Sequence, residues 1–155
     1  MNQVISFFKG KYGFLSNFYP SEILYEGILY HSSEAAYQAA KTDDPNEKIK
    51  FTSYSASKSK EEGKPLVKDK KLWYPKSLKI MEDILRIKFS HKSFKQYLLD
   101  TRDSILIEGN TWHDNFFGSC ICDKCGNVGE NHLGKLLMKI RDELRRDESG
   151  KNITN

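Results

Sequence analysis

The sequence predicts a compact single domain of the α+β class, mostly helical with a few short strands. Three observations lead to this prediction. The chain has 155 residues, the usual size of one domain. It is 38% hydrophobic and contains nine Phe, eight Tyr and two Trp, which is enough apolar material for a core. Segments with helix signals outnumber those with strand signals, and the two kinds do not alternate regularly.

Strand and turn signals dominate the beginning of the chain. Residues 4–8 predict a strand, and residues 10–20 predict a loop because glycines interrupt the segment and a proline closes it. Residues 23–25 and 28–30 flank a Glu-Gly pair, which is typical of a tight hairpin turn. We therefore expect a β-hairpin before the first helix.

Capping residues and apolar spacing predict the helices. Ser32 and Ser33 offer an N-cap to an alanine-rich helix that runs to Lys41. Asp44 followed by Pro45 begins a second helix. Further helices are expected at residues 77–89, around 94–98 and at 131–146, with a strand at 104–108 and a loop at 111–129.

The composition limits which binding partners and which cellular compartment are expected. With 25 Lys and Arg against 21 Asp and Glu, the net charge is +4, which permits a phosphate-bearing ligand or a nucleic acid but requires neither. No stretch approaches the roughly 18 consecutive apolar residues of a membrane span, and the first residues lack the layout of a signal peptide. We therefore expect a cytoplasmic protein without membrane contact. Residues 147–155 are polar, so we expect a flexible tail after a domain of residues 1–146.

The first candidate for chemistry is the helix at residues 33–41. Glu34, Gln38 and Lys41 lie at positions i, i+4 and i+7 and therefore share one face, with Tyr37 beside them. A carboxylate and an amine held close together can act as acid, base or electrostatic partner. A salt-bridge stripe on the surface of a small helix has the same spacing, so the pattern leaves both interpretations open.

Two aromatic loops are candidates for ligand binding. In residues 14–18, Ser16 and Asn17 lie between aromatic rings, which suits stacking and hydrogen bonding to a base or a sugar. Residues 112–118 place Asp114 among aromatic residues in a loop that ends in glycine. Loops that are anchored in the core by their aromatic rings have the same composition, so the residues alone do not distinguish a ligand-binding loop from a structural one.

The three cysteines lie close together as Cys120, Cys122 and Cys125. An odd number argues against a disulfide framework and for reduced thiols. Zinc binds such a set when a histidine completes it, and both His113 and His132 are within reach in the sequence. However, the usual zinc signature has two separated arms, and this chain has one crowded arm. We expect no metal, with zinc on the three cysteines and His132 as the alternative.

The last helix begins after the segment at residues 129–134. Free backbone N–H groups at a helix start favour anions, so a ligand phosphate is expected near residues 131–134. Many helices begin with glycine and asparagine without binding anything, which makes this signal unspecific.

Taken in order, these segments resemble the NADAR family, also called YbiA-like. The matching residues fall into five ordered blocks, which together are more specific than any one block. The blocks are Tyr12-Gly13 with Ser16-Asn17-Phe18; Ser33-Glu34 with Tyr37-Gln38-Ala39 and Lys41; Met81 with Lys88-Phe89; Asp114 with Phe117-Gly118; and Asn131 with Leu133-Gly134, Leu136-Leu137-Met138 and Arg141. The CxCxxC insertion is similar to that in some members. The chain departs from the family at Glu130, where lysine is frequent, and at Phe117, where tryptophan is frequent.

The resemblance implies a YbiA-like fold and an N-glycosidase that hydrolyses the bond between ribose C1′ and a nitrogen. Known activities of the family are removal of ADP-ribose from modified guanine in nucleic acid and cleavage of phosphorylated ribosylaminopyrimidines of the riboflavin pathway. The implied partners are therefore an ADP-ribose-containing or ribosyl-phosphate substrate and DNA or RNA that carries ADP-ribose. We expect no cofactor, because the chemistry needs only a carboxylate and an amine.

The resemblance also assigns roles to residues. It implies that Glu34, Lys41 and Asp114 are catalytic. The residues implied in substrate binding are Ser16, Asn17, Phe18, Tyr37, Gln38, Phe117, Gly118, Asn131 and Gly134. Two alternatives from other classes are a non-catalytic module that binds ADP-ribose or NAD and a small zinc-stabilised interaction protein.

Overall fold

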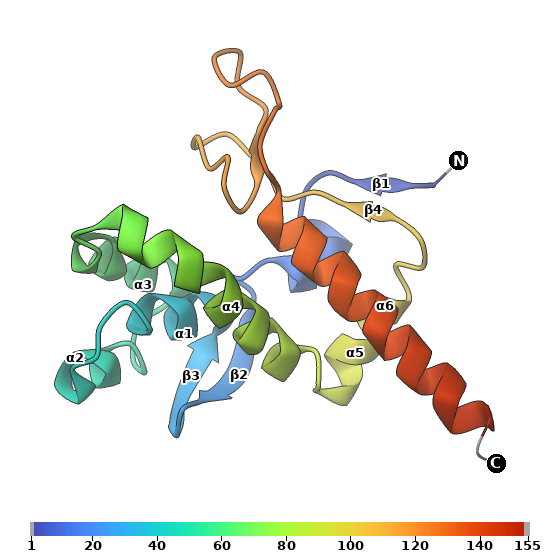
Figure 1. Ribbon diagram of the computed structural model, residues 1–155, viewed down its shortest axis with the longest axis horizontal. Helices are drawn as coiled ribbons and strands as arrows, with labels where there is room; N and C mark the ends of the chain where they lie inside the picture. The colour runs from blue at the N-terminus through green and yellow to red at the C-terminus, as the bar shows by residue number, and fades with distance from the viewer. Residues whose placement is uncertain (1, 154–155) are drawn as a thin grey trace. The chain divides into compact units, whose positions relative to one another are not determined.

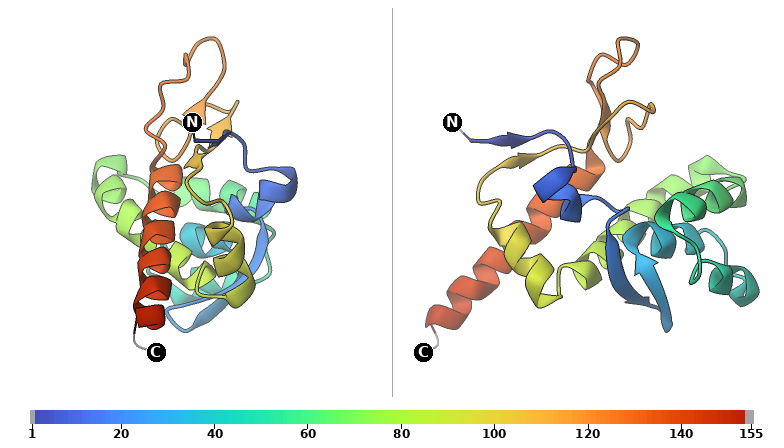
Figure 2. Two further views of the ribbon diagram at one scale, coloured as in Figure 1. Left: turned by 90° about the vertical axis from the view of Figure 1, so that its right-hand side faces the viewer. Right: turned by 180° about the vertical axis from the view of Figure 1, so that it is seen from behind.

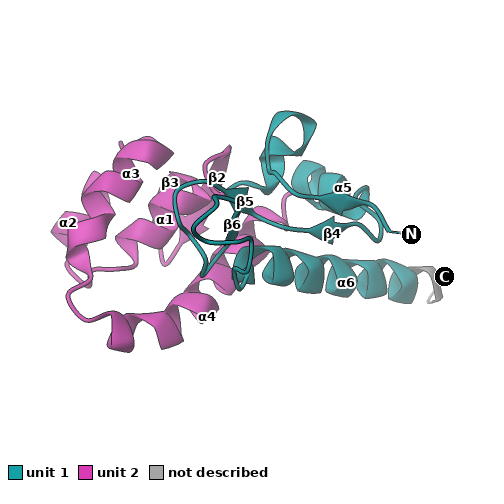
Figure 3. Cartoon of the chain, turned by 90° about the horizontal axis from the view of Figure 1, so that it is seen from above, with its two compact units in different colours: residues 1–16, 92–155 teal, residues 17–91 magenta. Residues whose placement is uncertain are grey.

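The computed structural model describes residues 2–153. The chain forms two compact units, which Figure 3 shows in different colours. Unit 1 comprises residues 1–16 and 92–155, and unit 2 comprises residues 17–91. Within the described residues, helices predominate and the strands form three two-stranded sheets. The α+β class with a few short strands is therefore confirmed.

Unit 2 combines a hairpin with a group of helices. In chain order its elements are β2 (Pro20–Tyr25), β3 (Ile28–Ser32), α1 (Ser33–Ala39), α2 (Pro45–Lys50), α3 (Ala56–Gly63), the 3₁₀ helix η2 (Lys64–Leu66) and α4 (Lys70–Lys88). Strands β2 and β3 are antiparallel, as predicted. Glu26 and Gly27 form the turn, with φ angles of 50° and 83°. Helix α1 follows β3 directly and packs on both strands and on α3 and α4 (Figure 1).

Side-chain caps fix the starts of the first two helices. The Ser32 hydroxyl accepts a hydrogen bond of 3.0 Å from the Ala35 amide at the start of α1. The Asp44 carboxylate accepts a hydrogen bond of 2.9 Å from the Asn46 amide at the start of α2. Every residue of α1 is buried, and its three alanines let neighbouring elements approach closely. Both caps agree with the sequence prediction.

The structure contains more helix in unit 2 than the sequence predicted. Helix α3 was not expected, because its polar composition gives no apolar stripe; Ser55 caps it by accepting a hydrogen bond of 3.1 Å from the Lys58 amide. Helix α4 begins at Lys70 rather than near residue 77, and it continues through Pro75. Asp69 caps this earlier start by accepting a hydrogen bond of 2.9 Å from the Lys71 amide.

Unit 1 is formed by both ends of the chain. Its elements are β1 (Val4–Ile5), the 3₁₀ helix η1 (Gly10–Leu15), α5 (Lys92–Leu99), β4 (Ile105–Leu106), β5 (Gly109–Asn110), β6 (Ser119–Cys120) and α6 (His132–Ile153). Strand β1 runs parallel to β4, and β5 runs parallel to β6 (Figure 2). The strands predicted at residues 4–8 and 104–108 are thus present but only two residues long. Strand β6 lies inside the segment that was predicted as a loop.

Helix α6 extends further than the sequence predicted. It continues to Ile153, so residues 147–153 of the expected tail are helical, while residues 154 and 155 lie outside the described part of the chain. Lys95 donates a hydrogen bond of 2.6 Å to the Glu148 carboxylate, which stabilises this extension. No helix among residues 2–153 has the length and the apolar run that crossing a bilayer requires.

Candidate active site

Helix α1 carries a buried carboxylate that is held by a neighbouring amide. Glu34 and Gln38 are only 8% and 4% exposed. The Gln38 side chain donates a hydrogen bond of 2.7 Å from Nε2 to Oε1 of Glu34. Glu34 and Gln38 therefore share one face as predicted, although α1 ends at Ala39 and not at Lys41, and their burial excludes the interpretation as an exposed salt-bridge stripe.

Lys41 lies just beyond the end of α1. Its backbone N–H donates to the Gln38 carbonyl at 3.1 Å, which continues the helical turn. Its Nζ lies 5.4 Å from the centroid of the Tyr37 ring. Burial lowers the pKa of Lys41 and outweighs the attraction of Glu34, which raises it; Lys60 lowers it further. The pKa of Lys41 is therefore lowered overall, which increases the fraction of free amine.

The ring of Tyr37 is held in place by Trp73 of α4. Trp73 donates a hydrogen bond of 3.1 Å from Nε1 to the Tyr37 hydroxyl. The two rings are 5.7 Å apart and tilted by 56°. Because both side chains are buried, Tyr37 forms a rigid aromatic surface next to Lys41.

The loop before β2 contacts the start of α1. The Asn17 carbonyl accepts a hydrogen bond of 3.0 Å from the Glu34 amide. The Asn17 side chain is buried and donates to the sulfur of Met81 at 3.4 Å. Phe18 is 43% exposed, and Nζ of Lys60 lies 5.8 Å from its ring centroid. Lys60 was not predicted as a site residue, because α3, which carries it, was not predicted.

Several buried polar atoms of unit 2 have no hydrogen-bond partner among the described residues. These atoms are Asn17 Oδ1, Ser21 Oγ, Ser33 Oγ, Gln38 Oε1 and Ser59 Oγ. Such atoms are uncommon in folded proteins and are usually satisfied by water or a ligand. Their grouping on β2, on α1, on α3 and in the preceding loop marks this part of unit 2 as the candidate active site.

Three of the predicted residues of unit 1, namely Asp114, Phe117 and Gly118, lie together in one loop. One carboxylate oxygen of Asp114 accepts hydrogen bonds from the amides of Phe116 and Phe117, at 3.1 and 3.0 Å. Asn110 accepts a hydrogen bond of 3.1 Å from the Asp114 amide. The Asp114 side chain therefore closes its own loop, a structural role that the sequence did not indicate, and its catalytic role stays a prediction.

The start of α6 is occupied by the same loop. The amides of residues 131–133 donate to the carbonyls of residues 116–118, so these three N–H groups are not available to a phosphate. The Asn131 side chain bonds the Glu108 amide at 3.0 Å and the Leu106 carbonyl at 2.9 Å. A side chain at Gly134 would collide with the Leu106 carbonyl. Asn131 and Gly134 thus have packing roles, and their contact with substrate stays a prediction.

The predicted site residues are divided between the two units. Asn17, Phe18, Glu34, Tyr37, Gln38 and Lys41 lie in unit 2, whereas Ser16, Asp114, Phe117, Gly118, Asn131 and Gly134 lie in unit 1. Ser16 ends the helix η1, where its amide donates to the Gly13 carbonyl at 2.9 Å. Phe117 packs edge-on against Phe116, with ring centroids 4.9 Å apart. A β-carbon at Gly118 would overlap with the Glu108 carbonyl, which explains the glycine.

The histidine predicted to lie with the three cysteines was the wrong one. The histidine that lies with the three thiols is His113, not His132. Instead, the ring of His132 contacts Phe116 at 4.7 Å between centroids, and its Nε2 lies 3.3 Å from a carboxylate oxygen of Glu130. Sequence proximity did not separate the two histidines, because both flank the cysteines.

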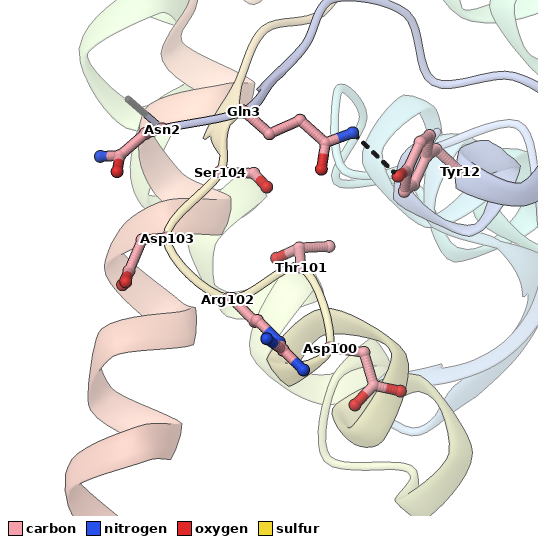
Figure 4. A pocket seen from close by; sticks show the side chains of 8 residues that line it. All are labelled: Asn2, Gln3, Tyr12, Asp100, Thr101, Arg102, Asp103 and Ser104. Atoms are coloured by element: carbon pink, nitrogen blue, oxygen red, sulfur yellow. Dashed lines mark hydrogen bonds between the residues drawn. The ribbon is translucent and has the colours of Figure 1, made fainter.

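A separate pocket of about 390 Å³ lies in unit 1 (Figure 4). It is lined by Asn2, Gln3, Tyr12, Asp100, Thr101, Arg102, Asp103 and Ser104. Gln3 donates a hydrogen bond of 3.3 Å to the Tyr12 hydroxyl across it. The pocket lining contains none of the predicted site residues, so it does not contribute to the candidate active site.

Comparison with known proteins identifies relatives over nearly the whole chain. A riboflavin biosynthesis protein of Vibrio vulnificus is 34% identical over 150 residues, which are 94% of this chain but only 40% of that protein. An N-glycosidase of Nostoc punctiforme is 32% identical and is matched over 86% of both chains. The N-glycosidase YbiA of Escherichia coli is 33% identical over 86% of this chain and 82% of its own.

The solved structures and the family models give the same assignment. The NMR structure of Escherichia coli YbiA matches with a TM-score of 0.78 and 28% identity, and the match covers 96% of this chain and 89% of that one. The fold is therefore YbiA-like, as the resemblance implied. The model of the NADAR domain matches residues 6–145, which include most of both units. The chain belongs to the NADAR family.

Proposed function

We propose that this chain is an N-glycosidase that removes ADP-ribose from ADP-ribosylated guanine in nucleic acid. Two relatives that match over most of their own length are named N-glycosidases. The observation that carries the proposal is the buried Glu34 carboxylate, oriented by Gln38 at 2.7 Å and accompanied by a lysine of lowered pKa. Buried, oriented acid–amine pairs of this kind are typical of active sites.

The proposed reaction uses both groups. Hydrolysis breaks the bond between C1′ and the base nitrogen, adds the hydroxyl of water to C1′ and leaves the proton of water on the departing nitrogen. Positive charge develops at C1′ as this bond breaks, and the carboxylate of Glu34 stabilises it or takes the proton from water.

Lys41 can take part in either of two ways. As an ammonium it donates a proton to the leaving nitrogen. As a free amine it attacks C1′ of the ring-opened sugar; the base nitrogen then leaves with a proton, and water hydrolyses the resulting imine. The lowered pKa of Lys41 increases the fraction of free amine and favours the second route.

The substrate base is proposed to stack on exposed aromatic rings. Phe18 is exposed next to the start of α1, and Lys60 adds a positive charge above its ring. We propose Phe117 and its loop, with Asp114, as a further substrate-binding element. The net charge of +4 suits a nucleic acid or a diphosphate, and the odd number of cysteines suits a reducing cytoplasm, where we place the activity.

A second candidate substrate is a phosphorylated ribosylaminopyrimidine of the riboflavin pathway. It is favoured by the name of the Vibrio vulnificus relative, although this chain spans 40% of that protein. The bond to be broken is again between C1′ and a nitrogen, so the same residues serve both reactions. The two candidates differ in the leaving group and in the phosphate that must be bound.

The test is a release assay with both substrates. Purified protein is incubated with a DNA oligonucleotide that carries ADP-ribosylguanine and, separately, with the ribosylaminopyrimidine phosphate, and the freed sugar is measured by mass spectrometry. We expect release from the DNA. Release from the pyrimidine alone would replace the first substrate by the second. Binding of ADP-ribose without any release would contradict the enzymatic proposal and indicate a non-catalytic module.

Matched carboxylate variants tie this assay to the site. Glu34→Gln should lower turnover about a hundredfold or more while substrate binding is kept, since it removes a charge that acts on the transition state. Glu47→Gln is the control, because the Glu47 carboxylate is exposed and pairs with Lys50 at 2.8 Å on α2. A Glu34→Gln protein that retains turnover within threefold of the control would remove Glu34 from the mechanism.

A further inference from the structure

Four potential metal ligands converge in the loop region of unit 1. Nδ1 of His113 lies 3.4 Å from the sulfur of Cys125, 3.5 Å from that of Cys122 and 3.8 Å from that of Cys120. All four ligand atoms lie within 4.8 Å of one another, and the three cysteines are free thiols. The residues come from two segments that are separate in sequence, so the convergence is a product of the fold.

Hydrogen bonding does not account for this arrangement. One imidazole nitrogen has a single hydrogen or a single lone pair and serves one partner at a time. Here one nitrogen faces three sulfur atoms at nearly equal distances. A tetrahedral zinc ion makes bonds of about 2.3 Å to sulfur and about 2.0 Å to nitrogen. With this geometry, the distance between a nitrogen ligand and a sulfur ligand is about 3.5 Å, and the distance between two sulfur ligands is about 3.8 Å. The observed nitrogen–sulfur distances agree with this geometry.

The backbone around the cluster is shaped to present the ligands. His113 has a φ of 68°, in the left-handed region that residues other than glycine rarely adopt. The amides of Cys125 and Gly126 both donate to the Cys122 carbonyl at 3.1 Å, and Gly126 has a φ of 64°. This tight turn brings two thiols to the same side. Cys120 is buried in β6, and its amide donates to the Asn115 side chain at 2.9 Å.

The surrounding segment is held by hydrogen bonds but has little apolar packing. Strands β5 and β6 pair over only two residues. Apolar side chains of the region are turned to solvent: Trp112 is 51% exposed, Ile121 46% and Val128 81%. Small regions without an apolar core are commonly held by a metal. Figure 2 shows the loops that precede and follow β6 extending together from the start of α6.

We propose that His113, Cys120, Cys122 and Cys125 form a structural zinc site. Four protein ligands complete the tetrahedral coordination, so the ion has no open position for a substrate or an activated water. Its role is to link the loop after β5, which carries His113 and Asp114, to β6 and the turn that follows it, which carry the three cysteines. The proposal does not depend on the glycosidase activity.

The first test measures metal on the full-length protein. Protein purified without chelators under reducing conditions is analysed by mass spectrometry for zinc, and the apoprotein is titrated with Co²⁺. We expect one zinc per chain and, with cobalt, the visible bands of tetrahedral coordination together with a thiolate-to-metal charge-transfer band. Less than about 0.1 zinc per chain with no tetrahedral cobalt spectrum would overturn the proposal.

The second test compares the two histidines. His113→Ala should weaken zinc binding more than about tenfold in competition with a chromophoric chelator, whereas His132→Ala should bind zinc like the wild type. Circular dichroism confirms that both variants are folded. The opposite result, loss in His132→Ala alone, would overturn the ligand assignment. Zinc removal from the wild type should also lower the melting temperature by at least about 5 °C.

Discussion

Gly63 lies directly against the side chain of Gln38. A β-carbon at position 63 would overlap with Oε1 and Cβ of Gln38, so only glycine lets α3 approach α1 this closely. Gln38 in turn donates to the carboxylate of Glu34 at 2.7 Å. The position of the proposed catalytic carboxylate is therefore set by the absence of a side chain on a neighbouring helix.

This contact makes Gly63→Ala a sensitive probe of the site. We expect the added methyl group to displace Gln38, to cost about 1–3 kcal/mol in the free energy of unfolding and to lower turnover about tenfold. Thermal unfolding and the release assay measure the two effects. Gly150→Ala in α6 is the control, because a β-carbon there meets no atom within 4 Å. Equal stability and turnover in the two variants would show that Gly63 does not position Gln38.

Lys41→Arg separates a catalytic amine from a simple positive charge. Arginine keeps the charge but neither forms an imine nor gives up its proton, so we expect turnover to fall about a hundredfold. Borohydride added during turnover should add the mass of the reduced sugar to Lys41. Full activity in Lys41→Arg would limit Lys41 to an electrostatic role.

Lys60 should tune the pH dependence through Lys41. Lys60 is a positive neighbour that lowers the pKa of Lys41, so Lys60→Gln should raise that pKa. Because the free amine is the reactive form in the favoured route, the rise of kcat/KM with pH should move to higher pH, by less than about one unit. Lys58→Gln on the same helix is the control, since Lys58 is paired with Glu62 at 2.8 Å. Identical profiles in both variants would exclude this coupling.

Lys88 should make stability depend on pH. It is fully buried near the end of α4, and burial lowers its pKa from 10.5 to about 7. Between these two values the unfolded chain binds a proton that the folded chain does not. Stability due to this group therefore rises with pH across the window, with a slope of up to about 1.4 kcal/mol per pH unit.

The matched variants for this prediction are Lys88→Met and Lys76→Met. Lys76 is exposed on the same helix, so its loss should leave the slope unchanged. Urea unfolding at several pH values between 7 and 10 gives the slopes. We expect a clearly flatter dependence in Lys88→Met, and parallel curves for both variants would contradict the assignment.

Arg141 should be a main determinant of the stability of unit 1. It is 5% exposed and donates from Nη1 to the Thr101 hydroxyl at 2.9 Å and to the Ser104 carbonyl at 2.8 Å. Arg141→Ala should cost about 3 kcal/mol in the free energy of unfolding, because buried acceptors lose their donor. Arg145→Ala, which removes an exposed side chain bonded to Asp103, should cost about 1 kcal/mol or less. Urea unfolding compares the two, and equal losses would show that burial does not matter here.

The elements that the sequence predicted well are those with local signals. The hairpin around Glu26 and the helices capped by Ser32 and Asp44 depend on residues within a few positions of one another. Helix α3 lacks an apolar stripe and was missed. The early part of α4, which contains Pro75, was missed because the apolar spacing that predicted this helix begins only after the proline.

The site was predicted less completely than the fold, for a physical reason. The shared face of Glu34 and Gln38 follows from helical spacing and was predicted. The contribution of Lys60 and the choice of His113 over His132 depend on contacts between segments that are distant in sequence. The spacing of residues along the chain does not predict such contacts. It also does not predict the burial that lowers the pKa of Lys41.

The discontinuous composition of unit 1 has a consequence for the order of folding. Residues 17–91 are contiguous, so unit 2 can form its contacts while the rest of the chain is still being synthesised. Strand β1, by contrast, precedes unit 2 in the chain but pairs with β4, which follows unit 2, through Val4 and Ile105. Closing so long a loop is entropically costly and slow. A strand that is synthesised before unit 2 thus finds its partner only after unit 2 has formed.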